Sequence, residues 1–326
     1  MHVPQPNLCS MKAIVSSPDG ARLADVPAPQ PAPHEILVQV KAASLNRADL
    51  AGLAARDGQV IGMEWAGEVV EVGVQAGPWR VGDRAMCTGA GAYAEYAVTD
   101  GGRAIRIPDA SLPYDEATVL TLALQAMHDA LVTHGRLMAG CDVLIHGASS
   151  GVGLMGLQIA RLLGARHVIG TSTDATKRAR LAEFGATLAL DPAEAGWHLQ
   201  AIDATGGKGV DVIVDQVTGK GFAQTMQTGA VGGRIVNLGR LGGAEGSFDF
   251  QLHALQRLAY IGVTFRSRSV AEIRELNASM LRDLGDAIGA GRLKLPIDSR
   301  YPLAQADEAL AHMSANRHFG KIVLTV

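Results

Sequence analysis

Cysteine is scarce in this sequence. The chain of 326 residues contains three cysteines, Cys9, Cys87 and Cys141, and no two of them stand in a Cys-x-x-Cys pattern. Three widely spaced cysteines do not make a disulfide framework or a structural zinc lobe. We therefore expect a protein of a reducing compartment, the cytoplasm.

Aromatic residues, excess charge and long apolar runs are also lacking. Phe, Trp and Tyr make up 4% of the residues, and the formal net charge is −3. Few rings or cations are thus available to bind nucleic acid or an anionic membrane surface. No apolar run reaches about 18 residues, and no apolar leader segment opens the sequence. We expect residues 1–10 to be a loose extension, and we expect no nucleic-acid or membrane partner.

The apolar residues that are present follow two different spacing patterns along the chain. Up to about residue 115, short apolar runs such as MKAIVSS (11–17) and EILVQVKAASL (35–45) are separated by Gly, Pro and Asp. This pattern is typical of a small β-barrel. From Asp115 onward, apolar strands such as DVLIHG (142–147) alternate with amphipathic helices, which indicates a parallel, doubly wound sheet. The fold class is therefore α/β.

The last part of the chain changes rhythm again. After about Arg268 come a long helix, a strand pattern, a second helix and a final apolar strand, KIVLTV (321–326). No parallel unit remains for this strand, so we expect it to return to the first domain. The predicted domains are a discontinuous β-barrel domain (1–118 and 268–326) and an inserted Rossmann dinucleotide-binding domain (119–267).

A glycine-rich turn, VLIHGASSGVG, lies between a predicted strand and a predicted helix. The pyrophosphate of a dinucleotide binds at such a helix N-terminus because free N–H groups and the helix dipole favour an anion. Gly147 ends the strand tightly, Gly151 lets the backbone approach a phosphate, and Gly153 allows close packing of helix on strand. The alternative is a tight turn that binds nothing. The predicted cofactor-binding residues here are Ser149, Ser150, Gly151, Val152 and Gly153.

The next strand ends in the letters TSTDATKR. An NAD enzyme usually has an acidic residue at this place, where it binds the ribose 2′-hydroxyl. Here Ser172 and Thr173 end the strand, and Lys177 and Arg178 follow one turn into the helix. Hydroxyl donors and cations suit a 2′-phosphate, so the sequence predicts NADPH. Asp174 is expected to cap the helix; if it points at the ribose instead, the preference weakens. The alternative for the two cations is a solvated helix face.

Further motifs occur in a fixed order along the chain, and together with the glycine-rich turn they carry a resemblance to a known family. They are SLNRADLAG (44–52), GMEWAGEVVEVG (62–73), VGDRAM (81–86), GAYAEYAV (91–98), HGASSGVGLMGLQIARLLGA (146–165), GVDVIVDQVTG (209–219), GGRIVNLGRLGG (232–243), TFRSRS (264–269) and HFGKIVL (318–324). In these motifs the chain resembles the zinc-free quinone oxidoreductase branch of the medium-chain dehydrogenase/reductase superfamily. The resemblance implies a GroES-like barrel domain, a Rossmann domain, and a homodimer that pairs near LAYIGVTF (258–265).

The resemblance also implies a pocket between the two domains. It places Asn46 and its NRADL turn beside the nicotinamide, and Gln125 on the first helix of the cofactor domain. It places Asn316 or Arg317 near the phosphates of the cofactor. The alternative for Asn46 is that it only caps a turn. The residues implied to line the nicotinamide side are Gly239, Arg240, Leu241, Thr264, Phe265 and Arg266.

Two related enzyme classes are excluded by residues that are missing. A short-chain dehydrogenase uses a Tyr-x-x-x-Lys pair, and none of the five tyrosines has a lysine four residues later. A zinc alcohol dehydrogenase has a Cys where this chain has NRAD, and a His where it has Met63. A thioether is a poor zinc ligand, and Glu64 alone does not hold a catalytic zinc. We therefore expect Glu64 to be a structural carboxylate near the cleft.

Several other side chains are candidates that also have a structural interpretation. Tyr93 is a proton-donor candidate by residue type, but its alternating context favours a strand core residue. Arg47 and Asp49 are expected to form a surface pair rather than to take part in catalysis. His146 precedes the glycine-rich turn and is expected to be a satisfied interior histidine. The substrate-pocket candidates are Asn46, Arg47, Gln125 and Tyr93.

Without a metal to polarise a carbonyl group, the small-molecule substrate has to be an acceptor that takes up hydride easily. Quinones and α,β-unsaturated carbonyls accept hydride at carbon and delocalise the charge onto oxygen, so they need little polarisation. The sequence predicts an NADPH-dependent reductase of these acceptors. An enoyl or alkenal double-bond reductase is the alternative, and a non-catalytic NADPH-binding protein is a further one.

Two departures from the resemblance leave the acceptor open. The loop LAARDGQVI (53–61) is shorter than the proline-rich, tyrosine-bearing loop of many relatives. In addition, Pro192 stands where relatives often have a tyrosine at the adenine.

Overall fold

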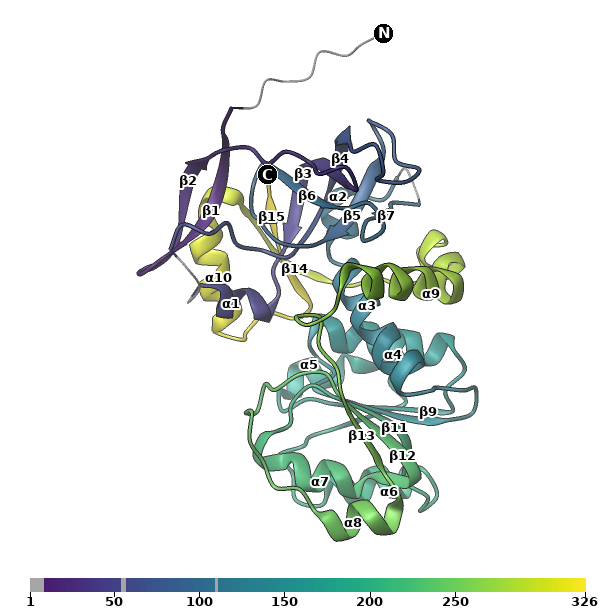
Figure 1. Cartoon of the computed structure of the whole chain (residues 1–326). Helices are drawn as coiled ribbons and strands as arrows, with labels where there is room; N and C mark the ends of the chain where they lie inside the picture. The colour runs from purple at the N-terminus through teal and green to yellow at the C-terminus, as the bar shows by residue number, and fades with distance from the viewer. Residues whose placement is uncertain (1–8, 54–56, 109–110) are drawn as a thin grey trace.

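The computed structural model describes residues 9–53, 57–108 and 111–326 (Figure 1). Two lobes are visible, one built on a sheet from both ends of the chain and one on a sheet from its middle. The predicted extension at residues 1–10 lies largely outside the described residues. The short loop at 53–61 is described only in part, because residues 54–56 are outside as well.

The first lobe contains a seven-stranded sheet in the order β14-β15-β3-β4-β5-β7, with β6 paired to β3, and a separate β1–β2 pair. The last strand returns to this sheet, as the sequence predicts: β15 pairs antiparallel with β3, placing Val323 opposite Ser44. The strand bounds are β1 Met11–Ser17, β2 Gly20–Val26, β3 Glu35–Ser44, β4 Glu64–Val72, β5 Arg84–Thr88, β6 Tyr96–Asp100, β7 Ile105–Arg106, β14 Ile297–Pro302 and β15 Lys321–Thr325.

The second lobe contains a six-stranded parallel sheet in the order β10-β9-β8-β11-β12-β13. Side chains that alternate along β8 explain why both of its faces are covered. Val143 and Ile145 join one apolar cluster, whereas Leu144 joins another that contains Trp197. The strand bounds are β8 Asp142–His146, β9 His167–Thr171, β10 Leu188–Leu190, β11 Val210–Asp215, β12 Gly229–Asn237 and β13 Ala259–Gly262.

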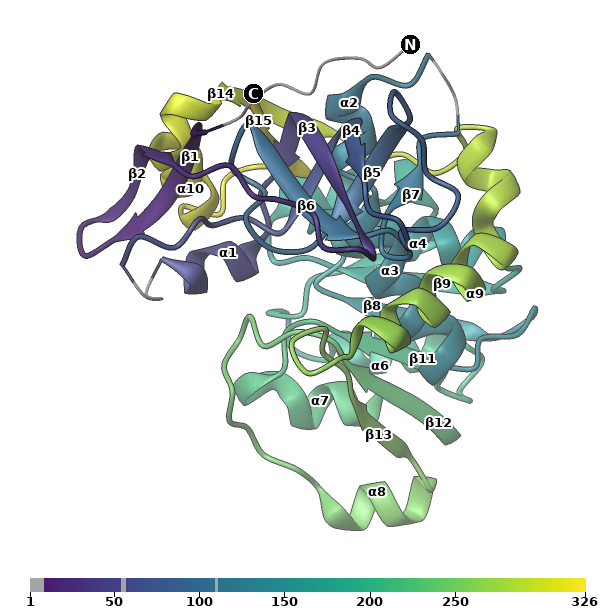
Figure 2. The ribbon, with the colours of Figure 1, turned by 45° about the horizontal axis from the view of Figure 1, so that its top comes forward.

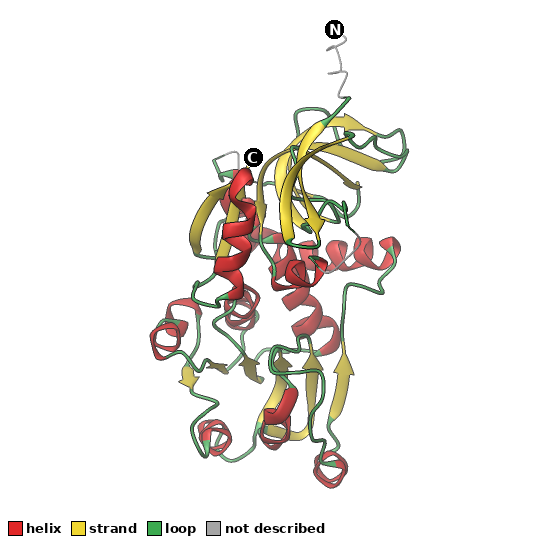
Figure 3. Cartoon of the chain, turned by 90° about the vertical axis from the view of Figure 1, so that its left-hand side faces the viewer, coloured by secondary structure: helices red, strands yellow, loops and turns green. Residues whose placement is uncertain are grey.

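Helices cover both faces of the parallel sheet, and Figure 3 shows helices between the two sheets. In the first lobe α10 lies beside β2, which Figure 2 shows from above. The helix bounds are α1 Arg47–Gly52, α2 Tyr114–Thr118, α3 Thr121–His128, α4 Gly151–Leu162, α5 Ala175–Ala179, α6 Trp197–Ala204, α7 Phe222–Gln227, α8 Phe250–Gln256, α9 Val270–Gly289 and α10 Ala306–Ser314. The helical segment that starts at Tyr114 is divided into α2, α3 and a last part that is not α-helical. A π-helical segment, Asp129–His134, follows α3, and a 3-10 turn, Leu181–Phe184, follows α5.

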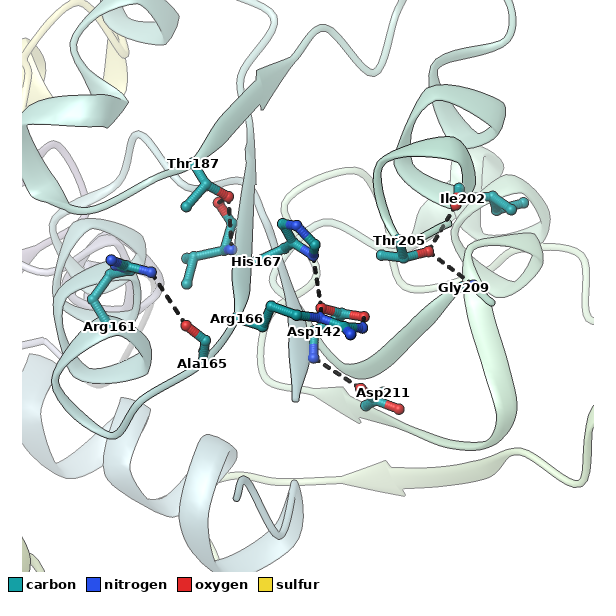
Figure 4. Close-up of polar contacts among 11 residues, drawn as sticks. Asp142, Arg161, Ala165, Arg166, His167, Thr187, Ile202, Thr205, Gly209 and Asp211 are labelled. Atoms are coloured by element: carbon teal, nitrogen blue, oxygen red, sulfur yellow. Dashed lines mark hydrogen bonds and ion pairs between the residues drawn. The ribbon is translucent and has the colours of Figure 1, made fainter. Parts of the chain in front are cut away.

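The amino ends of the parallel strands are fixed by a buried carboxylate (Figure 4). Asp142 begins β8 and accepts hydrogen bonds from Nε of Arg166 and Nδ1 of His167, both at 2.9 Å. Its backbone N–H donates to Asp211 at 2.8 Å, which ties β8 to β11. These contacts lie at the edge opposite the glycine-rich turn, which leaves the carboxyl edge for a ligand.

The predicted boundaries at 118/119 and 267/268 remain predictions. α2 packs on β3 and β4 of the first lobe, whereas α9 packs on α3 and also bonds Asp100 of β6 through Arg274. Within the described ranges, no helix combines the length and the apolar character that a membrane crossing requires. β13 is an edge strand of its sheet, and the homodimer predicted at this segment stays a prediction.

Candidate cofactor and substrate site

The glycine-rich turn joins β8 to α4 at the carboxyl edge of the parallel sheet. Gly147 has a φ of +82°, a left-handed conformation that favours glycine. Ser150 caps α4, because its Oγ accepts from the N–H of Gly153 at 3.0 Å. The predicted close packing at Gly153 is confirmed: a Cβ there would lie 2.7 Å from Cα of Ala148. The first N–H groups of a helix have no acceptor within it, so this end of α4 is suited to a phosphate.

A lysine from the end of the chain packs against this turn. A Cβ on Gly151 would lie 2.8 Å from Cδ of Lys321, and Ser150 forms a parallel bridge with Gly320. Gly151 thus makes room for Lys321, in addition to the approach of a phosphate that the sequence predicts. Lys321 belongs to β15, so the first lobe directly contacts the glycine-rich turn.

The second turn lies next to the first. Ser172 follows β9, and its hydroxyl donates to Oγ of Ser149 at 3.0 Å. Asp174 accepts from the N–H of Lys177 at 2.9 Å and caps α5, as expected. The carboxylate therefore serves the helix. Thr173, between them, is exposed.

Cations gather beside α5. Nζ of Lys177 donates to the backbone oxygen of Asn316 at 2.8 Å. Arg178 donates to the backbone oxygen of Ser172 and to Asp191, both at 2.8 Å. Both cations are therefore bonded to other segments and partly exposed. The choice between a 2′-phosphate site and a solvated helix face is not decided by these bonds. Lys177 also lines a cavity together with Asp174, Thr176, Arg180, Arg317 and Phe319.

His318 lies near two cations and a carboxylate. Burial is the main cause that lowers the pKa of His318 to about 4. The cationic Lys177 and Arg47 act in the same direction, and the carboxylate of Asp298 acts against them.

Asn46 lies between the lobes and is almost completely buried. Its Oδ1 accepts from Nζ of Lys321 at 2.8 Å, and its Nδ2 donates to Oε2 of Glu64 at 2.9 Å. Glu64 and Lys321 also form an ion pair at 2.9 Å. The carboxamide is thus held at both ends, and the proposed place of Asn46 beside a nicotinamide stays a prediction.

Glu64 is fully buried at the start of β4, as expected for a structural carboxylate. Its Oε2 accepts from the hydroxyl of Ser44 at 2.5 Å, as well as from Asn46 and Lys321. Its Oε1 accepts from the backbone N–H of Leu122 at 2.7 Å. Because Leu122 lies in α3, this carboxylate joins the first lobe to the second.

The expectation that Arg47 and Asp49 form a surface pair is wrong. Asp49 is buried and accepts from the N–H of Asn46 at 2.7 Å and from the hydroxyl of Tyr93 at 2.6 Å. Arg47 donates instead to Oδ1 of Asn316 at 2.9 Å. Two side chains that are two residues apart on a helix do not face each other, which explains the separation. Burial raises the pKa of Asp49 to about 6, although both hydrogen bonds act in the other direction.

Two candidates with structural interpretations are core residues. Tyr93 is fully buried, and its hydroxyl is used by Asp49. His146 is buried, its Nδ1 lies 2.8 Å from Oγ1 of Thr171, and its ring stacks on Trp197 at 5.4 Å. The expectation of a satisfied interior histidine is confirmed.

Gln125 is also fully buried, on α3. Its Nε2 donates to Oδ1 of Asn277 in α9 at 2.7 Å, and its Oε1 accepts from Thr88 at 3.3 Å. Its predicted contact with a cofactor is not tested by these bonds. They do show that both ends of the amide already have partners.

The predicted nicotinamide-side residues follow adjacent strands at the same sheet edge. Gly239, Arg240 and Leu241 come after β12, and Thr264, Phe265 and Arg266 come after β13. One residue that sequence reasoning missed links them to the glycine-rich turn. Gln216 accepts from Ser150 at 3.0 Å and donates to the oxygen of Gly147 at 3.1 Å. A Cβ on Gly239 would lie 2.6 Å from the oxygen of Gln216.

Comparison with known proteins places this architecture in a family. The alcohol dehydrogenase GroES-like domain matches residues 32–109, and the zinc-binding dehydrogenase model matches residues 163–324. The quinone oxidoreductase of Rattus norvegicus is 30% identical over 311 residues, which are 92% of this chain and 92% of that protein. The chain belongs to the quinone oxidoreductase branch of the medium-chain dehydrogenase/reductase superfamily.

Solved structures of this superfamily share the fold. A mycobacterial quinone oxidoreductase has a TM-score of 0.86 and 29% identity, covering 97% of this chain and 100% of that one. A mycobacterial relative solved in complex with NADPH has the same values. The predicted GroES-like and Rossmann architecture is therefore confirmed. The mycocerosic acid synthase-like polyketide synthase of Mycobacterium tuberculosis is 31% identical over 91% of this chain, but the match spans only 14% of that protein.

Zinc, which the name of one matching family model implies, does not fit the residues of this chain. Glu64 already faces the ammonium of Lys321 at 2.9 Å, and a carboxamide and a thioether, from Asn46 and Met63, stand where ligands would be needed. In the part of the chain that the structure describes, no group of three or more His, Cys, Asp or Glu side chains could hold a metal.

Proposed function

We propose that this chain is a metal-independent reductase that uses NADPH to reduce quinones or activated α,β-unsaturated carbonyls. The observation that carries the proposal is the joined pair of turns, with Ser172 bonded to Ser149 and cations lining the cavity beside α5. The mycobacterial relative solved with NADPH supports the choice of cofactor.

Different residues would hold different parts of the cofactor. The start of α4 would hold the pyrophosphate, because its N–H groups and dipole favour an anion. Ser172, Lys177 and Arg317 would hold the 2′-phosphate, since hydroxyls and cations bind phosphate oxygens. The loops after β12 and β13 would flank the nicotinamide. Bound there, NADPH supplies a hydride to the electrophilic carbon of the acceptor, and a proton from solvent completes the two-electron reduction.

The chain's own contribution to the reaction is orientation and the exclusion of water. Asn46, Glu64 and Lys321 are nearly or fully buried between the lobes, and their polar groups are bonded to one another. Tyr93 and Asp49 are bonded to each other. An acceptor that stabilises its own negative charge suits such a site, whereas a simple ketone would need a stronger electrophile.

A second acceptor class, an enoyl thioester, is favoured by the polyketide synthase relatives. Among them are highly reducing polyketide synthases of Fusarium pseudograminearum and Cordyceps militaris, each 30% identical to this chain, which spans 12% of each. Saturation of a conjugated C=C bond also needs only hydride at carbon followed by a proton.

Steady-state assays that follow NADPH absorbance with quinones, enones and enoyl thioesters test the proposal. Turnover with NADPH is expected for at least one of these classes. No turnover with any acceptor would refute the proposed reaction.

A further inference from the structure

The network around Glu64 joins parts of the chain that are far apart in the sequence. Asn46 precedes α1, Glu64 begins β4 and Lys321 begins β15, yet their polar atoms lie within 2.9 Å of one another. All three side chains are nearly or fully buried. A carboxylate and an ammonium that are removed from water need each other, because an unpaired buried charge is costly.

The two charged groups determine the orientation of one neutral group. The carboxamide of Asn46 has one acceptor and two donors. Lys321 donates to Oδ1 and Glu64 accepts from Nδ2, so a flipped amide would place its NH2 against the ammonium and its oxygen against the carboxylate. The carboxamide is therefore held in a single orientation.

Lys321 also connects this carboxamide to the glycine-rich turn. Its Cγ and Cδ would lie 3.0 and 2.8 Å from a Cβ on Gly151, at the first position of α4. Asn46 is thus one lysine side chain away from the helix end suited to the pyrophosphate. The N–H of Leu122 holds the other oxygen of Glu64, so α3 fixes the network from the second lobe.

We propose that Glu64 and Lys321 are positioning residues that present the carboxamide of Asn46 to the nicotinamide half of the bound cofactor. The pair aligns Asn46 with the glycine-rich turn, so the dinucleotide meets one rigid surface from pyrophosphate to nicotinamide. This inference rests on the proposed use of NADPH. A purely structural pair would stabilise the fold without affecting the reacting end of the cofactor.

A charge-balanced double variant separates these two roles. Lys321→Met leaves the carboxylate of Glu64 without its cation, so the urea midpoint is expected to fall. Glu64→Gln with Lys321→Met removes both charges and is expected to recover most of the midpoint. In that double variant the carbonyl of the new amide at position 64 stays with the N–H of Leu122, so its NH2 group faces Asn46 and cannot accept from Nδ2. The carboxamide of Asn46 is then no longer held in its wild-type orientation. Hydride transfer, measured with 4-deuterated NADPH in single turnovers, is therefore expected to stay about 100-fold slow, as in Asn46→Ala.

A matched control comes from the opposite edge of the sheet. Asp142, which is buried, and Arg166 form an ion pair at the start of β8 (Figure 4). The glycine-rich turn follows the other end of that strand. Arg166→Met leaves the buried carboxylate of Asp142 without this partner, so it is expected to lower the urea midpoint as Lys321→Met does, while leaving hydride transfer within about twofold of wild type. Recovery of both midpoint and hydride transfer in the Glu64/Lys321 double variant would overturn the positioning role. Wild-type hydride transfer in Lys321→Met would also overturn it.

A binding measurement keeps this inference separate from the proposed reaction. The emission of bound NADPH reports the surroundings of the nicotinamide without any acceptor. The double variant is expected to show the altered emission of Asn46→Ala, and a wild-type emission would overturn the inference. If wild type binds NADPH but reduces no acceptor, the proposed function fails, and this comparison alone decides whether the pair positions Asn46.

Discussion

Replacing Asp49 by Asn is expected to change how the stability of the protein depends on pH. Burial raises the pKa of this carboxyl from 3.8 to about 6 in the folded state. Below the lower value the carboxyl is protonated in both states. As the pH rises through the higher value, the folded state has to hold a buried carboxylate, so stability that is present in acid is lost.

The magnitude follows from the size of the shift. At about 1.4 kcal/mol per pKa unit, a shift from 3.8 to about 6 corresponds to about 3 kcal/mol of unfolding free energy. About 2 kcal/mol of this is expected to be lost between roughly pH 4.5 and pH 7.5, where both proteins can be unfolded in urea. Asp49→Asn does not titrate, so wild type is expected to lose this amount relative to the variant.

Asp83→Asn is the control with the opposite sign. The hydrogen bond from Arg106 holds the pKa of Asp83 below its usual value. Wild type is therefore expected to gain stability relative to this variant as the pH rises through the acid range. Parallel pH profiles for wild type and Asp49→Asn would refute the reasoning about the buried carboxyl.

Other substitutions test the cofactor site and the core. Lys177→Met is expected to weaken NADPH binding about tenfold and to leave NADH binding unchanged, because only NADPH carries the 2′-phosphate; equal losses in fluorescence titrations would contradict this. Gly153→Ala is expected to lower the unfolding free energy by more than about 1 kcal/mol, since its Cβ would lie 2.7 Å from Cα of Ala148. Gly285→Ala, in open space on α9, is expected to raise the unfolding free energy by about 0.5–1 kcal/mol. A Gly153→Ala protein that is more stable to urea than Gly285→Ala would contradict both expectations. Trp197→Ala removes the stacking partner of a buried histidine and is expected to cost about 3–5 kcal/mol; a loss below about 1 kcal/mol would contradict that packing.

Local features of this fold could be predicted from the sequence. The glycine-rich turn and the cap at Asp174 depend on a few neighbouring residues, so their letters carry the information. The return of the last strand could be inferred because KIVLTV (321–326) comes after the last β-α unit of the parallel sheet. The π-helical segment after α3 could not be predicted, since apolar spacing does not distinguish an α-helix from one that continues as a π-helix.

The network between the lobes could not be predicted, because its members have no sequence spacing in common. Asn46, Glu64 and Lys321 meet only when β15 pairs with β3. One signal was present: a lysine opens an otherwise apolar final strand, and a buried charge requires a partner. The sequence placed Asp49 at the surface because it is charged and close to Arg47 in the chain. Its burial becomes apparent only in the folded structure.

The most direct test is the rate of NADPH oxidation by the purified chain in the presence of a metal chelator. Quinones, enones and enoyl thioesters serve as acceptors, and NADH replaces NADPH in a parallel series. We expect turnover with at least one acceptor, unaffected by the chelator and faster with NADPH. Absence of turnover with every acceptor, or activity that the chelator abolishes and added zinc restores, would contradict the account.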